Sequence, residues 1–266
     1  MVDLVRIGSE TAKGGFANEK IISEKFENWR KDKEAQKWLK TMGYELKKIK
    51  KVKAEVLHGH KTDVQIKVTI TLKKLIFVQN LSIKKTNSGA DYNQIDKRWV
   101  KNYIDLWEIP ENIITLLKIF CGEISPSELL RESKITKQKY DRLKDKRRFF
   151  MDEFENKHKK EIVDFFKKNK ILVLTDIIKG RDQFSANWML VTKYNKNEDE
   201  TTWILADINK VLNIFGEGEV EISPRGSLSI GRVTLQRKGG DCGRPTGNML
   251  QFKIKPCDLF RYSQGR

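Results

Sequence analysis

The sequence has 266 residues, a length that fits one sizeable domain or one domain with a modest second lobe. Lys and Arg outnumber Asp and Glu by 53 to 36, and this net charge of +17 favours a polyanionic partner. No apolar stretch is long enough to span a membrane, and residues 1–20 lack the apolar run of a signal peptide, so we expect a cytoplasmic protein. The cysteines are scattered without metal-ligand spacing, which argues against a thiolate metal site.

The first predicted element is a helix over about residues 18–39. Apolar residues, Ile22 and Phe26 among them, recur on one side of it at helical spacing. Glu19 falls about 20° from Phe26 around the helix axis and therefore shares the core-facing stripe. A carboxylate on a buried side needs a cation or a hydrogen-bond donor, which makes Glu19 a candidate site residue.

A hairpin is predicted next, from a strand over Asp63–Leu72 and a second strand over about Leu75–Lys85. Apolar and polar residues alternate along both strands. Antiparallel pairing would bring Ser82 and Lys84 towards the Asp63 end of the first strand, on one polar face.

The remaining segments alternate between helical and strand patterns. In chain order we expect a turn at 87–93, helix over 94–119, a charged and weakly patterned insertion at 123–146, an amphipathic helix over 149–170, a buried strand at 171–177, a strand followed by a helix over 202–215, and a strand-rich, glycine-containing region at 219–260. Strands flanked by helices predict one α/β domain over residues 1–266, with a mixed central sheet.

The hairpin and Glu19 supply the groups that phosphodiester hydrolysis requires. Asp63 and Glu19 together could bind Mg²⁺, which usually takes one or two protein carboxylates. Lys84 could position the attacking water or stabilise the charge that develops on the phosphate. The arrangement is a degenerate PD-(D/E)XK nuclease pattern. On residue types alone an ordinary polar strand face explains it better, and only with the hairpin geometry and the core-facing Glu19 do the two interpretations become about equal.

Longer stretches resemble the HinP-type, GCGC-cutting type II restriction endonucleases. The matching stretches are Gly8–Lys20, Phe26–Trp29, Asn93–Lys97, Asp145–Arg148, Leu172–Ile177, Ser223–Ser227, Gly231–Thr234, Gln236–Asp241 and Asn248–Ile254. They span almost the whole chain, with an insertion mainly at 125–139. This family belongs to the PD-(D/E)XK superfamily and is related to the CCGG-cutting MspI and, more distantly, to the mismatch-repair nicking enzyme MutH.

The resemblance implies a restriction-endonuclease-like fold with a catalytic core over about residues 1–120. It implies that Asp63 binds the metal, that Lys84 is the catalytic lysine and that Glu19 is the helix carboxylate. Ser82 stands where the superfamily has a carboxylate and this family has an amide. Its hydroxyl can bind a metal only weakly, directly or through a water, which puts a second fully ligated metal in doubt.

DNA-contact residues are expected in the C-terminal region 219–260 and after the catalytic hairpin. Arg and Lys suit the guanine O6 and N7 acceptors, Asp suits the cytosine amino group, and amides can bridge. The first-rank candidates for a G/C-only site are Gln236, Arg237, Lys238 and Asp241. Arg225, Arg232 and Gln251 are second-rank candidates, for base or phosphate contact. Asn93, Gln94 and Lys97 are expected at the minor groove near the scissile base pairs, although Asn93 could equally cap a helix.

The sequence therefore predicts a Mg²⁺-dependent type II restriction endonuclease that cuts double-stranded DNA at a short G/C palindrome, with GCGC as the expected site. The resemblance further implies a bacterial or archaeal source, a monomer that acts with a single active site, which is compatible with a back-to-back dimer, and a cognate DNA methyltransferase that a separate gene encodes. The two alternatives are a repair nickase or junction resolvase of the same superfamily and a non-enzymatic DNA-binding protein.

Overall fold

A computed structural model describes residues 17–57, 65–73, 75–195, 199–239 and 244–262. The chain forms two compact units. Unit A comprises Ser9–Asn93, Ile178–Ile214 and Lys255–Arg266, and unit B comprises Met1–Gly8, Gln94–Ile177 and Phe215–Ile254. None of the helices in the described part of the chain has the length and apolar character needed to cross a membrane.

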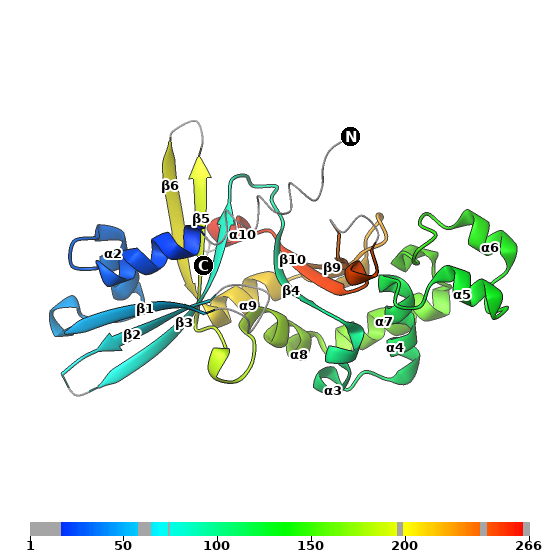
Figure 1. Ribbon diagram of the computed structural model, residues 1–266, viewed down its shortest axis with the longest axis horizontal. Helices are drawn as coiled ribbons and strands as arrows, with labels where there is room; N and C mark the ends of the chain where they lie inside the picture. The colour runs from blue at the N-terminus through cyan, green and yellow to red at the C-terminus, as the bar shows by residue number, and fades with distance from the viewer. Residues whose placement is uncertain (1–16, 58–64, 74, 196–198, 240–243, 263–266) are drawn as a thin grey trace. The chain divides into compact units, whose positions relative to one another are not determined.

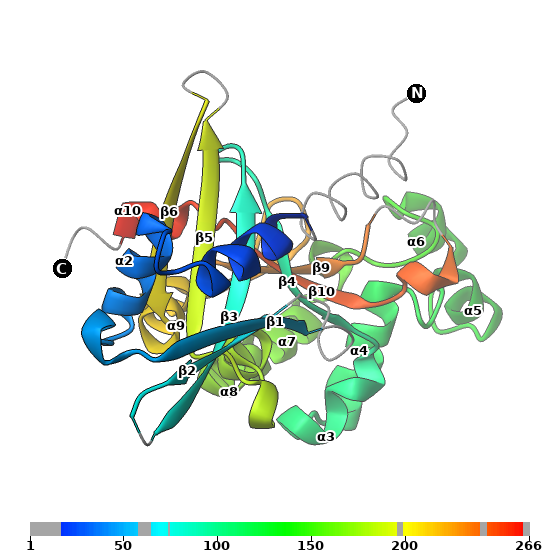
Figure 2. The ribbon, with the colours of Figure 1, turned by 60° about the vertical axis from the view of Figure 1, so that its left-hand side comes forward.

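Unit A is built on a mixed five-stranded sheet in the order β1-β2-β3-β5-β6 (Figure 2). Its strands are β1 (Lys51–Leu57), β2 (Gln65–Thr71), β3 (Ile76–Thr86), β5 (Trp188–Asn195) and β6 (Glu200–Asp207). All neighbouring pairs are antiparallel except β3 and β5, which run parallel. The hairpin predicted from alternation is confirmed, because β2 and β3 pair with Gln65 opposite Ser82.

The core of unit A lies between one face of this sheet and the N-terminal helices. The first helix covers residues 17–27, and α2 (Lys33–Thr41) follows it. Ile22 and Phe26 pack in one cluster with Leu81 and Ile83 of β3. The remaining helices of this unit are α9 (Ile208–Gly216), which continues into unit B, and α10 (Asp258–Tyr262).

The single helix predicted over 18–39 is wrong, since the structure has two helices separated by a turn at 28–31. The Asp32 side chain caps the second helix by accepting a hydrogen bond from the Ala35 amide (2.9 Å). An Asp that finds a free amide three residues ahead favours a new helix start over continuation of the old helix.

Unit B contains the second five-stranded sheet, in the order β4-β10-β9-β8-β7. Strands β4, β9 and β10 are labelled in Figure 1. Its strands are β4 (Asn93–Arg98), β7 (Val220–Ile222), β8 (Leu228–Ile230), β9 (Val233–Arg237) and β10 (Leu250–Ile254). Its helices are α3 (Ile104–Trp107), α4 (Glu111–Cys121), α5 (Pro126–Arg131), α6 (Lys137–Arg142), α7 (Asn156–Lys168) and α8 (Lys170–Leu174). The strand-rich region predicted at 219–260 is confirmed, and the insertion at 123–146 holds two short helices.

Two predictions in unit B are wrong. Residues 94–98, predicted as helix, belong to strand β4, and residues 171–177, predicted as a buried strand, belong to α8 and the π-helical turn Thr175–Lys179 that follows it. Ile171 is 84% exposed whereas Val173 is buried. An apolar run of this length fits a strand or a buried helix about equally well. In a helix, only the residues on one side of the run have to be buried.

Candidate functional site

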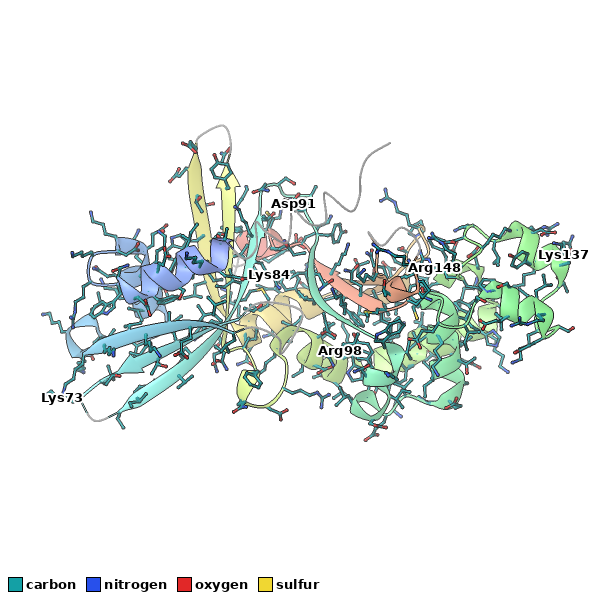
Figure 3. All side chains as sticks on the ribbon, viewed as in Figure 1. Lys73, Lys84, Asp91, Arg98, Lys137 and Arg148 are labelled. Atoms are coloured by element: carbon teal, nitrogen blue, oxygen red, sulfur yellow. The ribbon has the colours of Figure 1, made fainter. Side chains whose placement is uncertain are left out.

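Strand β3 carries two of the predicted active-site residues, Ser82 and Lys84. Ser82 pairs with Met189 of β5 and Lys84 with Val191, so alternation puts all four side chains on the same face of the sheet. Lys84, labelled in Figure 3, is only 5% exposed. An ammonium group at this depth must be held by polar or anionic partners, because burying a charge is costly.

The middle of β3 is anchored by Asn80, which no sequence motif had indicated. Its side-chain amide donates to the carbonyl oxygens of Gln183 (2.8 Å) and Ser185 (3.0 Å). Its backbone N–H donates to the Asn187 side-chain oxygen (2.8 Å), and the Asn187 N–H donates back to its carbonyl (2.8 Å). These four bonds fix the position of the strand just before Ser82.

Glu19 lies on helix 17–27 and is 6% exposed, which confirms the predicted core-facing orientation. The helix packs through Ile22 and Phe26 in one buried cluster with Leu81 and Ile83 of β3. The neighbouring Asn18 accepts a hydrogen bond from the Thr192 hydroxyl of β5 (3.3 Å).

Asp63 lies outside the described residues, as does Asp241. Within the described ranges, no group of three or more His, Cys, Asp or Glu side chains is placed to hold a metal ion. Metal binding by Asp63 and Glu19 therefore stays a prediction.

The turn after β3 is organised by Asp91 (Figure 3). Its carboxylate accepts hydrogen bonds from the backbone N–H groups of Asn87 (2.8 Å) and Ser88 (2.9 Å) and from the Ser88 and Thr86 hydroxyls (2.7 and 3.2 Å). Partial burial opposes ionisation, but the hydrogen bonds from Ser88 and Asn87 outweigh it and lower the pKa of Asp91. The turn leads into Asn93, whose side chain donates to the Lys85 carbonyl (3.0 Å). Asn93 begins a strand, so the interpretation of it as a helix cap is wrong.

In unit B, three of the predicted contact residues form a chain of amides across neighbouring strands. Gln236 of β9 pairs with Gln251 of β10 in the sheet register, and its Nε2 donates to the Gln251 Oε1 (3.1 Å). The Gln251 Nε2 in turn donates to the Oε1 of Gln94 on β4 (2.6 Å). The structure thus brings together residues that are 157 positions apart in the sequence.

Arg237, one position after Gln236, is placed very differently. It is 7% exposed and lies on the buried face of β9 with Leu235. Its guanidinium donates to the Asn248 side-chain oxygen (2.9 Å) and to the carbonyls of Cys121 (3.1 Å), Lys238 (3.1 Å) and Arg244 (3.4 Å). Asn248 also donates to the Gly122 carbonyl (2.7 Å). These bonds join the end of β9 and the segment before β10 to the end of α4.

The other predicted contact residues differ in exposure. Arg225 is exposed, Lys97 and Lys238 are half-buried, and Arg232 forms an ion pair with Glu217 (2.8 Å).

A buried charge network in unit B was missed by the sequence analysis, although Asp96 and Asp176 both fall in stretches that carry the family resemblance. Arg98 (Figure 3) donates to Asp176 (3.1 Å) and to Asp96 (3.2 Å). The Tyr103 hydroxyl donates to Asp96 (2.8 Å), and the Trp107 indole donates to Asp176 (3.1 Å). Burial, reinforced by the Asp96 charge, raises the pKa of Tyr103 well above its usual range, so the hydroxyl remains a donor.

Comparisons with known proteins bear on the class of this fold. A crystal structure of the restriction endonuclease MspI in complex with its cognate DNA matches with a TM-score of 0.57 and 14% sequence identity, over 93% of this chain and 92% of that chain. The protein therefore has the mixed α/β fold of a restriction endonuclease. The comparison with curated proteins finds no match.

The family model described as R.HinP1I restriction endonuclease matches residues 42–260, and the chain belongs to that family. It is a type II site-specific nuclease. Of the three functions considered from the sequence, this membership favours the restriction endonuclease over a repair nickase or a non-enzymatic DNA-binding protein.

Proposed function

We propose that this enzyme hydrolyses phosphodiester bonds of double-stranded DNA at a short G/C palindrome, with GCGC as the expected site. The observation that carries the proposal is the buried Lys84 on β3, two positions after Ser82, in a chain of this family. The net charge of +17 suits a polyanionic substrate, and the structural relative MspI was solved with its cognate DNA.

The proposed active site consists of Asp63, Glu19, Ser82 and Lys84. Mg²⁺ is usually bound by one or two protein carboxylates, so Asp63 and Glu19 would hold a single Mg²⁺, with the Ser82 hydroxyl as at most a weak ligand. When bound, the cation lowers the pKa of an attacking water and offsets negative charge on the phosphate. Asp63 precedes Gln65 by two positions, and Gln65 pairs with Ser82, which supports a shared site with Lys84.

In this proposal the protein's own side chains orient the reacting groups and stabilise the charge that develops on the phosphate. Asp63 and Glu19 hold the cation, and Ser82 contributes its hydroxyl directly or through a water. The Lys84 ammonium donates to the attacking water or to a phosphate oxygen, where it stabilises charge as it develops. In-line attack leaves a 5′-phosphate and a 3′-hydroxyl.

The assignment of Lys84 is tested by a matched pair of substitutions on the same strand. Lys84→Ala should abolish cleavage in Mg²⁺ and leave binding of the cognate duplex nearly intact. Lys85→Ala is the control, because Lys85 is the next residue and is exposed. It should retain cleavage. Both rates are measured on a duplex with one GCGC site, and full activity of Lys84→Ala would overturn the active-site assignment.

Digestion of a plasmid of known sequence in Mg²⁺ tests the specificity. Discrete fragments whose ends map to GCGC are expected. Scattered nicks would indicate a nickase without base specificity, and fragments that end at another sequence would overturn the site but keep the reaction. We further propose a monomer with one active site that cuts the strands one at a time, and a separately encoded DNA methyltransferase that protects the same sequence.

A further inference from the structure

The segment after α6 contains two adjacent arginines that share one carboxylate. Arg147 binds Asp145 through two parallel hydrogen bonds, from its Nε (2.8 Å) and its Nη2 (2.9 Å), and its backbone N–H donates to the same carboxylate (3.0 Å). The Nε of Arg148 lies 3.7 Å from the Asp145 Oδ2, which is beyond hydrogen-bond distance. Asp145 therefore binds Arg147 tightly and offsets the charge of Arg148 only in part.

A second carboxylate near Arg148, that of Glu153, is also engaged. Its two oxygens accept hydrogen bonds from the backbone N–H groups of Lys144 and Phe150 (2.7 Å each). Burial and the nearby positive charge of Arg237 together lower the pKa of Arg148. A further anion bound at this place would stabilise both guanidinium groups.

Aromatic rings hold the side chain of Arg148 (Figure 3). Its guanidinium carbon lies 4.0 Å from the centroid of the Phe150 ring and 5.7 Å from that of Phe120. The Arg148 side chain is 15% exposed, compared with 53% for Arg147. Among the described residues, the buried side-chain nitrogens that lack a hydrogen-bond partner do not include those of Arg148, so its donors reach the surface. A planar guanidinium stacked on a ring in this way is already oriented for a ligand.

We propose that Arg148 binds a phosphate group of the DNA backbone. This inference rests on the proposed function, in which double-stranded DNA is the substrate. The N–H donors of a guanidinium form a fork that matches two phosphate oxygens, and a phosphate brings a full negative charge, whereas the acceptors of a guanine edge are neutral. Arg237, the charged neighbour of Arg148, is flanked in the chain by Gln236 and Lys238, two of the predicted DNA-contact residues.

The test removes single charges from the DNA and the guanidinium from the protein. Each phosphate of a duplex that contains the cleavage site is replaced in turn by a neutral methylphosphonate, and binding is measured without Mg²⁺ to prevent cleavage. Arg148→Met should bind the unmodified duplex about tenfold more weakly than the parent. It should lose no further affinity when the phosphate bound by Arg148 is replaced. The slope of log affinity against log salt should become shallower by about 0.9, the value for one phosphate.

Arg142→Met is the matched control, because Arg142 is an exposed arginine on α6 and its loss removes the same charge. This variant should stay sensitive to replacement of the phosphate assigned to Arg148. Arg148→Lys keeps the charge and removes the fork, so its sensitivity should be reduced at that phosphate alone. It provides the same test if Arg148→Met does not fold, which the urea unfolding midpoint of each variant shows.

The outcomes separate this inference from the proposed function. A parent enzyme that binds no DNA would overturn both. If the parent binds DNA and both Arg148 variants remain as sensitive as the parent at every phosphate, the inference is wrong and the proposed function stands. A loss of discrimination at one base pair in Arg148→Met, with unchanged sensitivity to the phosphates, would show that the guanidinium contacts a base instead.

Discussion

At the scale of single residues, the alternation of side chains along a strand decides which of two adjacent polar residues can contact a ligand. Gln236 and Arg237 are adjacent, and their residue types predict base contact for both. The structure leaves Gln236 half-buried and turns Arg237 into the interior, where its donors engage Asn248 and backbone carbonyls. Residue type could not reveal this, because a guanidinium suits guanine and carbonyl clusters equally well. The face on which each residue lies follows from the strand register.

We expect Arg237→Ala to lower the free energy of unfolding by about 3–5 kcal/mol, because it leaves buried acceptors without donors. Affinity for cognate and non-cognate DNA should then fall together. Urea unfolding and binding of both duplexes measure the two effects.

Lys238→Ala is the comparison for Arg237→Ala, since the side chain of Lys238, the next residue, is only half-buried. If Lys238 contacts a base, the substitution costs about 1–3 kcal/mol of discrimination with little change in stability. A specific loss of discrimination at one base pair in Arg237→Ala, with unchanged stability, would contradict the structural role given to Arg237.

At the scale of elements, the alternation of apolar and polar residues predicted secondary structure well, whereas continuous apolar runs predicted it poorly. The β2–β3 hairpin was recognised because apolar residues such as Val68 and Ile70 recur at every second position, a period that helices do not share. The run at 171–177 has no such period, and its assignment depended on tertiary burial. Strand β4 could not be predicted from six largely polar residues, because its pairing with β10 comes from the other end of the chain. The β2–β3 hairpin was therefore predictable, whereas the contact between Gln94 and Gln251 was not.

The boundary between helix 17–27 and α2 depends on Asp32. We expect Asp32→Ala to destabilise the protein by about 1 kcal/mol, since the Ala35 amide loses its cap. The ion pair of Asp32 with Lys25 (3.5 Å) is partly exposed and adds little. Asp32→Asn keeps the capping oxygen and should retain most of the stability in urea unfolding. Equal losses in the two variants would assign the effect to the charge and not to the cap.

The turn held by Asp91 should make the stability of unit A depend on acidity. The pKa of Asp91 is lower in the folded state than in the unfolded chain, so its contribution is fully present above the ordinary aspartate pKa of about 4 and is lost as the pH falls through the lower folded value. Asp91→Asn should therefore be less stable than the parent at neutral pH, by about 1–2 kcal/mol from the lost hydrogen bonds. The difference should shrink below about pH 4 in urea titrations. A gap that stays constant from neutral pH to pH 3 would show that the charge of Asp91 does not contribute.

At the scale of the whole molecule, the proposed active-site residues and most of the predicted DNA-contact residues belong to different compact units. Ser82 and Lys84 lie in unit A, whereas Gln94, Gln236 and Gln251 lie in unit B. Each unit has its own five-stranded sheet and its own buried polar cluster, around Asn80 in one and Arg98 in the other. Rate and discrimination should accordingly respond to different sets of substitutions.

The net charge of +17 predicts how binding should respond to salt. A protein that neutralises about 6–10 phosphates loses about 10³- to 10⁵-fold in affinity between about 50 and 200 mM salt, because the released counterions are diluted into a higher background. Cognate and random-sequence duplexes should both show a steep decline in fluorescence anisotropy titrations. Gln236→Leu should lower cognate affinity without changing the slope, since an amide neutralises no phosphate. A slope near zero for the parent would mean that its excess lysines and arginines do not contact DNA.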